Sequence, residues 1–542
     1  MRRVLVLARA SFGLLAFLGA CAGDRPPSMP APAKVASPVV AGQAAVAPGA
    51  GLVPLAIAAS PPPAEVETDL VDGSQGAQAD AKLELGVSEP GAQVAPAPPP
   101  RGTQMGYLLV DLASGRELAS LHPDLPLIPA STTKLATAIV ALDALGPEFR
   151  FRTELRAAGP VREGVLEGDL ILKGGGDPAL DVADLLELAV HLSTAGIREV
   201  HGRFLIDDTA LPRSPEIAPD QPAEAPYNPG IGALSVAFNR VHVAWRGAGR
   251  AVEAVTLPPL EEARFEAALP DRLPPGGVEL GSRQDGTVVW RVADRGRRRQ
   301  ASELPVKDPG LHAGNLFRRL ALALDIVVGA PERGMAPADA ILIAVHESAP
   351  LRQLLHDTLL YSNNMMAETI GLAAAQQLKR SYGQAPEGAL LVRHLAQLMP
   401  EVDWRGAVLP NNSGLDGSAR LTPRQLAAIV RYGWRSDALP ALLPASGWSG
   451  TLAGRFDDAA LRVWAKTGSV HYGGALAGYL LPDNQGPAAF VTMVSDLGAR
   501  AAYDALPRPN RAADAAASAW NASARGLLDD LVEGWLTPPP TS

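Results

Sequence analysis

The chain has 542 residues, too many for a single hydrophobic core, so we expect two or more domains. Hydrophobic residues make up 47% of it and charged residues 19%, a balance typical of folded proteins. The net charge of −9 argues against nucleic acid as the main partner.

The first residues predict export. Arg2 and Arg3 precede an apolar stretch, the arrangement of a signal peptide. The stretch ends in Leu18-Gly19-Ala20-Cys21, which resembles the lipobox of bacterial lipoproteins, and Cys21 is the only cysteine in the chain. That resemblance implies a lipoprotein signal peptide over residues 1–21, a lipid anchor on Cys21 and a periplasmic location, with Ala22 favouring the outer membrane. The alternative is an ordinary signal peptide with an incidental cysteine.

Residues 22–100 consist mainly of Ala, Pro, Gly, Ser and Val. Such a segment buries too little apolar surface to offset its chain entropy, so we predict a disordered Pro/Ala-rich tether. Beyond it, no run of about eighteen apolar residues occurs, and we expect no membrane-spanning helix there. Residues 536–542 are predicted to form a tail.

Hydrophobic periodicity predicts the elements of the folded part. Residues 107–120 have the pattern of a β-hairpin with its turn at Ser114-Gly115, and a helix follows from Ser131 to Leu145. Two helices are predicted to meet at residues 362–364. The other expected elements are strands at 165–172, 199–206, 463–469, 475–481 and 488–495, and helices at 311–327, 424–432 and 515–535.

Ser131 and Lys134 stand three positions apart at the start of the first predicted helix. Positions i and i+3 share one helix face, so the hydroxyl and the amine could reach each other. A serine is a poor nucleophile unless a base takes its proton, and a desolvated lysine can be that base. The plainer interpretation is a serine helix cap followed by a solvated lysine.

The use of lysine in this chain favours a chemical role for Lys134. Lysine occurs at only seven positions, whereas 41 of the 48 basic residues are arginine. Arginine stays protonated and cannot act as a base. A lysine in such a chain is therefore more often chemically required.

Three short motifs follow one another along the chain: Ser131-x-x-Lys134, Ser362-x-Asn364 and Lys466-Thr467-Gly468. Each occurs once. About one chain in a thousand of this composition would contain all three in this order by chance, and the third motif is the one least expected by chance. The 227 residues between Lys134 and Ser362 are enough for an inserted domain.

These motifs resemble those of the penicillin-recognising serine enzymes, and the long insertion resembles their D-alanyl-D-alanine carboxypeptidase/endopeptidase branch, the S13-type low-molecular-mass penicillin-binding proteins. The resemblance covers residues 101–535. Two departures, Asn411-Asn412 and Asp416-Gly417, stand where that branch usually has other residues beside its Ser-Gly-Leu motif. Further similar stretches are Gly174 to Pro178, Asn228-Pro229, Ala233 to Ser235, Lys307 to Pro309, Ser413 to Leu415 and Gly450 to Leu452.

The resemblance implies a fold of mixed α and β structure. We expect a penicillin-binding-protein/β-lactamase-like serine hydrolase domain, in which helices cover an antiparallel sheet. That catalytic domain would be split between residues 101–158 and 308–535. Residues 159–307 would form a large β-rich insertion.

The resemblance also implies a role for each site residue. Ser131 would be the nucleophile and Lys134 its general base, with Lys466 supplying positive charge. Ser362 would relay the proton and Asn364 would orient Lys134 and the substrate. The residues implied to bind the substrate are Thr467, Gly468, Ser469, Ser413, Gly414 and Leu415, with backbone N–H groups of Ser131 and Ser469 as the oxyanion hole.

The implied activity is that of a serine-type D-Ala-D-Ala carboxypeptidase or endopeptidase acting on peptidoglycan peptides, with β-lactams as covalent inhibitors and no cofactor or metal. The alternatives are a β-lactamase or esterase on the same scaffold, or an inactive wall-binding protein. A Ser-His-Asp site is disfavoured because no G-x-S-x-G motif is present. The histidines also lack the spacing of a metal-binding motif such as H-E-x-x-H. His471, the histidine closest to a motif, is expected at the surface.

Overall fold

The computed structural model describes residues 102–248, 251–261, 263–270, 273, 277–283, 287–295, 299–483, 486–506 and 511–536. The predicted signal peptide with Cys21, the predicted tether and all but the first residue of the predicted tail lie outside this part. Among the residues that the structure describes, no helix is both long and apolar enough to cross a membrane.

The first sheet is antiparallel and joins the two ends of the described chain. Its five strands lie in the order β17-β18-β19-β1-β2. The pairing of β1 with β19 places Leu108 opposite Val491 and Asp111 opposite Ala488. The strands are β1 (Gln104–Asp111), β2 (Glu117–Leu121), β17 (Val463–Val470), β18 (Gly473–Leu480) and β19 (Ala488–Ser495).

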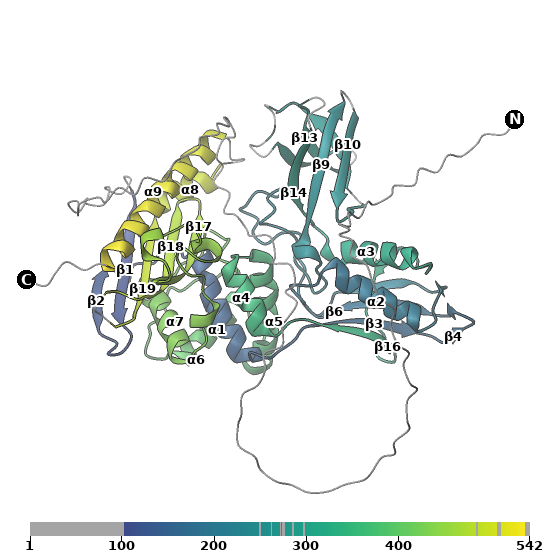
Figure 1. Cartoon of the computed structure of the whole chain (residues 1–542), viewed down its shortest axis with the longest axis horizontal. Coiled ribbons are helices and arrows are strands. Elements are labelled where there is room, and N and C mark those ends of the chain that lie inside the picture. The colour runs from purple at the N-terminus through teal and green to yellow at the C-terminus, as the bar shows by residue number, and fades with distance from the viewer. Residues whose placement is uncertain are drawn as a thin grey trace, which may run out of the picture. The chain divides into compact units, whose positions relative to one another are not determined.

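Helices cover both faces of this sheet, which explains why β18 and β19 are buried along their whole length. Leu108 and Val110 point into the main core beneath α1 and α7, whereas Leu109 points to the opposite face, where α9 lies (Figure 1). This alternation is the two-residue period of a strand. The helices are α1 (Thr133–Leu145), α4 (Leu351–Leu360), α5 (Asn364–Tyr382), α6 (Glu387–Leu398), α7 (Pro423–Arg435), α8 (Leu497–Asp504) and α9 (Arg511–Leu536).

A second five-stranded sheet, in the order β15-β8-β6-β3-β16, lies in the middle of the chain. Helices α2 (Val182–Thr194) and α3 (Pro309–Ala323) share its buried core. Its strands are β3 (Arg152–Ala158), β6 (Asp169–Gly174), β8 (Phe204–Asp207), β15 (Pro331–Arg333) and β16 (Ile341–Glu347).

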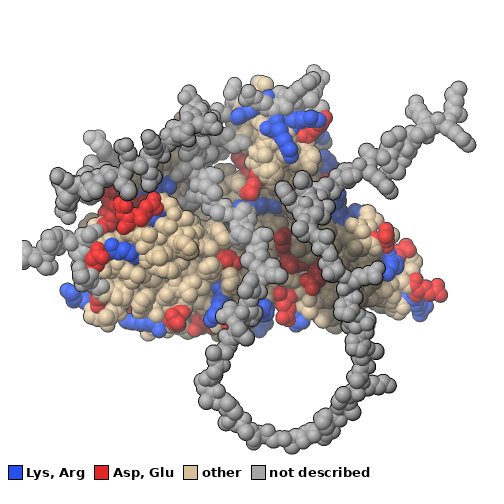
Figure 2. All heavy atoms as spheres, viewed as in Figure 1, with Lys and Arg blue, Asp and Glu red and all other residues tan. Residues whose placement is uncertain are grey.

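Two three-stranded sheets, β10-β9-β14 and β11-β13-β12, enclose a further core that includes Trp245 and Trp290. A small sheet has the order β4-β5-β7. The strands of these three sheets are β4 (Val161–Arg162), β5 (Val165–Leu166), β7 (Glu199–Val200), β9 (Arg240–Ala248), β10 (Ala251–Leu257), β11 (Phe265–Ala268), β12 (Val278–Ser282), β13 (Val288–Ala293) and β14 (Gln300–Pro305). Figure 2 shows acidic and basic side chains scattered over the face in view, in several places side by side.

The strands predicted at 165–172 and 199–206 are each broken in two. The first becomes β5 and β6 because its halves pair with different partners, β5 with β4 and β7, and β6 with β3 and β8. The division of the chain at 158/159 and 307/308 stays a prediction. Strand pairing argues for moving its boundaries outward, since β3 and β16 belong to the second sheet with β6.

Candidate active site

Ser131 lies at the sheet-facing start of α1, in the single 3₁₀ turn Ala130–Thr132 that leads into the helix. Its hydroxyl is not a helix cap. Instead, the Oγ atom of Ser131 accepts a hydrogen bond of 2.9 Å from Nζ of Lys134. The interpretation as a serine cap with a solvated lysine is therefore wrong, because Lys134 is only 1% exposed.

The amine of Lys134 lies at the centre of the site. Besides Ser131, its Nζ atom donates to Oδ1 of Asn364 at 2.6 Å and to the carbonyl oxygen of Ser413 at 3.0 Å. These partners come from three separate parts of the chain; Asn364 and Ser413 are buried, and Ser131 is partly exposed. Burial disfavours the charged form of an amine, so this environment suits a lysine that must lose its proton.

Ser362 and Asn364 occupy the predicted corner between α4 and α5. Ser362 is buried and has a φ of 58°, a left-handed conformation that turns the chain between the two helices. Asn363 caps α5, its side chain accepting from the N–H of Met366 at 3.0 Å. Asn364 begins α5 and donates through Nδ2 to the carbonyl oxygen of Tyr227 at 3.1 Å. The relay role of Ser362 stays a prediction.

Strand β17 carries Lys466, Thr467, Gly468 and Ser469 past the backbone of Ser131. A Cβ atom on Gly468 would lie 3.0 Å from the backbone nitrogen of Ser131, tighter than ordinary contact, so the strand needs glycine there. Lys466 is fully buried, and its Nζ donates to the carbonyl oxygen of Thr467 at 2.6 Å. Oγ1 of Thr467 is buried without a hydrogen-bond partner among the described residues, which leaves it available to a ligand.

Part of the outer edge of β17 is already paired. The N–H of Ala465 donates to the carbonyl oxygen of Pro444 at 3.1 Å, and the N–H of Ser446 donates to that of Val463 at 2.8 Å. Within the described chain, β17 is the end strand of its sheet, so no further strand pairs with the edge beyond Ala465. An extended peptide can add to such an edge.

Ser413, Gly414 and Leu415 form a loop that packs against the 3₁₀ turn of Ser131. Gly414 has a φ of 77°, and a Cβ atom there would lie 1.9 Å from the carbonyl oxygen of Ala130. No other residue could bring this loop so close to the nucleophile. Leu415 is buried, and the N–H of Leu415 donates to Oγ of Ser413 at 3.3 Å.

Glu368 is a site-supporting residue that the sequence reasoning missed. Its carboxylate is buried on α5 and accepts from the backbone N–H of Asn412 at 3.0 and 3.1 Å and from that of Ser413 at 2.8 Å. Nδ2 of Asn412 adds a contact of 3.0 Å. Burial raises the pKa of Glu368, whereas these N–H donors favour its charged form. The carboxylate thereby holds the loop whose carbonyl receives Lys134.

The two departures from the usual motif are accommodated by the structure. Asn411 accepts from the N–H of Gly414 at 3.0 Å and so shapes the Ser413 loop. Gly417 packs against Arg500, whose Cζ would lie 2.2 Å from a Cβ atom at that position. Arg500 is 2% exposed and pairs with Asp220 at 2.6 Å, an acidic residue of the insertion that also accepts from the N–H of Gly417 at 3.3 Å.

His471 is partly exposed, less than the surface position that was expected. Its ring packs edge-on against Tyr503 with centroids 4.6 Å apart, and burial lowers the pKa of His471. Oγ of Ser469, two residues earlier, accepts from Nδ2 of Asn521 on α9 at 3.4 Å. In the part of the chain that the structure describes, no three His, Cys, Asp or Glu side chains converge in a metal-binding arrangement.

Comparison with known proteins gives the same assignment along most of the chain. The model of the D-Ala-D-Ala carboxypeptidase 3 (S13) family matches residues 92–511. A D-alanyl-D-alanine carboxypeptidase of Actinomadura sp. (strain R39) is 30% identical over 441 residues, which cover 72% of this chain and 77% of that protein.

Two solved structures share the fold. The crystal structure of penicillin-binding protein 4 from Haemophilus influenzae has a TM-score of 0.65 at 22% identity, covering 79% of this chain and 97% of that chain. The complex of that protein with a novel β-lactam gives 0.62 at 20% identity with the same coverage. The predicted fold, a penicillin-binding-protein/β-lactamase-like domain with a long insertion, is confirmed.

Proposed function

This chain belongs to the D-Ala-D-Ala carboxypeptidase 3 (S13) family, and we propose that Ser131 carries its reaction as the nucleophile of a serine-type D-Ala-D-Ala carboxypeptidase acting on peptidoglycan peptides. The observation that supports this most directly is the 2.9 Å hydrogen bond between Ser131 Oγ and the buried amine of Lys134. A nucleophile hydrogen-bonded to its own buried base is the arrangement that acyl transfer requires.

Acylation uses the neutral amine of Lys134 as the base. The amine takes the proton of Ser131 while Oγ attacks the carbonyl carbon of the penultimate D-alanine. The backbone N–H groups of Ser131 and Ser469 stabilise the oxyanion, each worth about 3–4 kcal/mol in comparable sites. The close approach of Gly468 to the Ser131 backbone supports this pairing, because it sets the strand that carries Ser469 beside the nucleophile.

The tetrahedral intermediate then collapses. The C–N bond breaks, the leaving amine of the terminal D-alanine receives the proton by way of Ser362, and the acyl group stays on Ser131. Thr467 and Ser469 hold the terminal carboxylate, and the buried hydroxyl of Thr467, which has no hydrogen-bond partner among the described residues, supports that role. Buried Lys466 adds the positive charge that attracts this carboxylate and disfavours a second charge on Lys134. Water then hydrolyses the acyl ester: its hydroxyl group leaves on the peptide product, and its remaining proton returns to Oγ of Ser131.

The protein should form a stable adduct with penicillin, because a β-lactam acylates Ser131 but leaves no group that diffuses away. Intact-mass measurement after adding penicillin is expected to show the mass of one added molecule, and peptide mapping should place it on Ser131. Steady penicillin turnover without an accumulating adduct would favour a β-lactamase or esterase. If neither an adduct nor turnover is observed, the inactive wall-binding protein is the remaining interpretation.

A second assay compares the release of D-alanine from a pentapeptide with the cleavage of cross-linked peptides. It separates carboxypeptidase from endopeptidase activity.

We further propose that the protein is a periplasmic lipoprotein anchored through Cys21, with residues 22–100 as its tether. The Leu-Gly-Ala-Cys sequence and the use of a single cysteine support this. Replacing Cys21 with Ala is expected to move the protein from the membrane fraction to the soluble periplasmic fraction. Membrane retention of the variant would refute the anchor, and separating inner from outer membranes identifies which one holds the wild type.

A further inference from the structure

A main-chain carbonyl of the insertion, that of Tyr227, contacts the catalytic machinery. The amide of Asn364 is engaged at both ends, since Oδ1 accepts from Lys134 at 2.6 Å and Nδ2 donates to the carbonyl oxygen of Tyr227 at 3.1 Å. An amide has one accepting and one donating end, so the carbonyl of Tyr227 selects the orientation that presents oxygen to the lysine. Rotation of the amide would turn its NH₂ group towards that amine instead.

The residue after Tyr227 is held firmly by its side chain. Asn228 is fully buried, and its Oδ1 atom accepts from the N–H groups of Ile217 and Ala218, both at 2.9 Å. Its Nδ2 atom donates to the carbonyl oxygen of Ala218 at 3.0 Å. The segment from Ile217 to Asn228 is thereby closed on itself as a compact loop.

Lys307, in the short link between β14 and α3, holds this loop in place. Its Nζ atom donates to the carbonyl oxygen of Asn228 at 3.1 Å, one peptide unit from the carbonyl that holds Asn364. Just before Lys307, the carbonyl oxygen of Val306 accepts from the N–H of Gly230 at 2.8 Å. The loop is therefore fixed on the same side by a main-chain bond and by the lysine.

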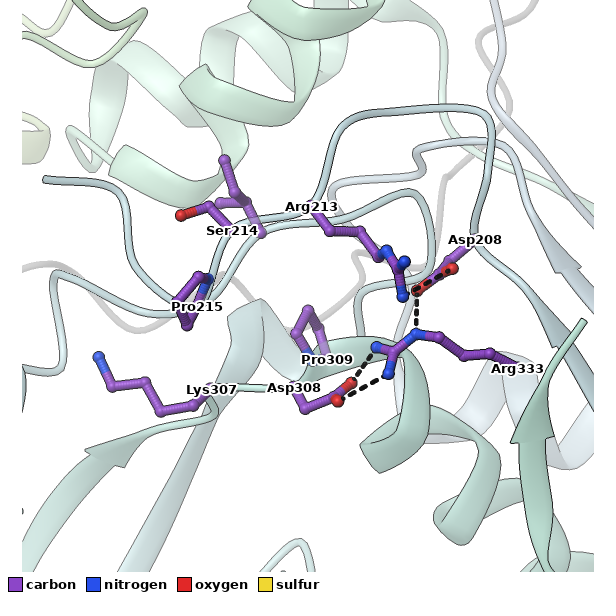
Figure 3. Close-up of a pocket in the computed structure, with 9 residues that line it drawn as sticks. Asp208, Arg213, Ser214, Pro215, Lys307, Asp308, Pro309 and Arg333 are labelled. Atoms are coloured by element: carbon purple, nitrogen blue, oxygen red, sulfur yellow. Dashed lines mark hydrogen bonds and ion pairs between the residues drawn. The ribbon is translucent and has the colours of Figure 1, made fainter. Parts of the chain in front are cut away.

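Lys307 lines a cavity of about 420 Å³ in which the other charged side chains pair with one another (Figure 3). Arg333 binds Asp308 at 2.5 and 3.0 Å and Asp208 at 3.4 Å, and Arg213 lies 3.7 Å from Asp208. Figure 3 shows the amine of Lys307 directed away from this cluster. Glu216 lies 4.0 Å from that amine, and burial lowers the pKa of Lys307. Lys307 thus binds the loop and not the arginine–aspartate cluster.

We propose that Lys307 is a positioning residue for acylation: it fixes the Tyr227–Asn228 backbone, which orients the Asn364 amide, which in turn holds the amine of Lys134 against Ser131. This rests on the proposed function of Ser131 and Lys134. It makes a lysine of the insertion part of the reaction without contact with substrate.

The test uses stopped-flow acylation of the full chain by a fluorescent penicillin, which separates the dissociation constant of the initial complex from the acylation rate constant. Lys307→Met is expected to lower the rate constant about ten- to a hundredfold, the scale of one misplaced hydrogen bond in a site. The dissociation constant should change less than threefold, because the implied carboxylate-binding residues lie on β17. Lys307→Arg keeps a donor and should restore the rate constant to within about fivefold of wild type.

Arg213→Met is the matched control, since it removes a cation from the same cavity without touching the Asn228 carbonyl. Its rate constant should stay within twofold of wild type. In a protein that already carries Asn364→Ala, Lys307→Met should lower the acylation rate constant less than twofold, because both changes break the same chain of contacts. The proposal is overturned if Lys307→Met acylates at the wild-type rate. It is also overturned if Lys307→Met lowers the rate constant equally in the wild-type protein and in Asn364→Ala. Failure of the wild type to form an adduct would instead refute the proposed function.

Discussion

Lys134→Arg is expected to slow acylation by penicillin about ten-thousandfold or more, although it preserves the positive charge. That is the scale of losing one member of a catalytic triad. Arginine cannot give up a proton at any accessible pH, so it cannot take one from Ser131. Its planar fork also cannot match the directions of the three acceptors that the amine of Lys134 contacts.

Intact-mass measurement over several hours gives the adduct yield for wild type and Lys134→Arg, and circular dichroism confirms that each is folded. Ser131→Ala is the control without a nucleophile and should give no adduct at any time. An Arg variant that acylates within tenfold of the wild-type rate would remove Lys134 from the role of base and leave it as a positively charged neighbour.

Glu368→Gln is expected to lower the free energy of unfolding by about 2–4 kcal/mol and the acylation rate constant about tenfold or more. The two carboxylate oxygens accept four hydrogen bonds from Asn412 and Ser413. Glutamine replaces one acceptor by an NH₂ group, which would face buried donors and push this loop away. The carbonyl of Ser413, an acceptor of Lys134, would move with it.

Denaturant unfolding and stopped-flow acylation measure the two effects on the same samples. Glu387→Gln provides the matched control, because it breaks a partly exposed 2.9 Å ion pair with Lys379 and should cost less than about 1 kcal/mol. If Glu368→Gln were as mild as this control, the four donors would not depend on the charge of the Glu368 carboxylate.

The local parts of the site could be predicted from the sequence because each motif lies on one element. Ser131 and Lys134 are neighbours on one helical face, Ser362 and Asn364 lie at one helix corner, and Gly468 marks a strand that passes close to another backbone. The hydrophobic periods on either side of each motif predict its helices and strands correctly. The two predicted strands that are broken, at 165–172 and 199–206, lie away from the motifs.

The supporting contacts could not be predicted, because they join side chains to backbone groups far along the chain. Glu368 lies on α5 one turn after Asn364, in a stretch that otherwise reads as a buried helix, and nothing in its neighbours reveals the N–H groups of Asn412 and Ser413. The carbonyl of Tyr227 carries no sequence signal at all. The place of β3 and β16 in the second sheet has the same origin, since the two strands pair across a long separation in the chain.

The pairing of β1 with β19 also sets when the enzyme can exist during its synthesis. Asp111 and Ala488, opposite each other in that pair, are 377 positions apart, and Lys466 is supplied only by the last part of the chain. At about 5–20 residues per second, a ribosome needs about 20 to 75 s to make the intervening residues. Until then the N-terminal hairpin has no neighbour on its inner edge and Ser131 has no β17 beside it. Under the proposed mechanism, the nascent chain is therefore inactive until β17 and β19 have been made.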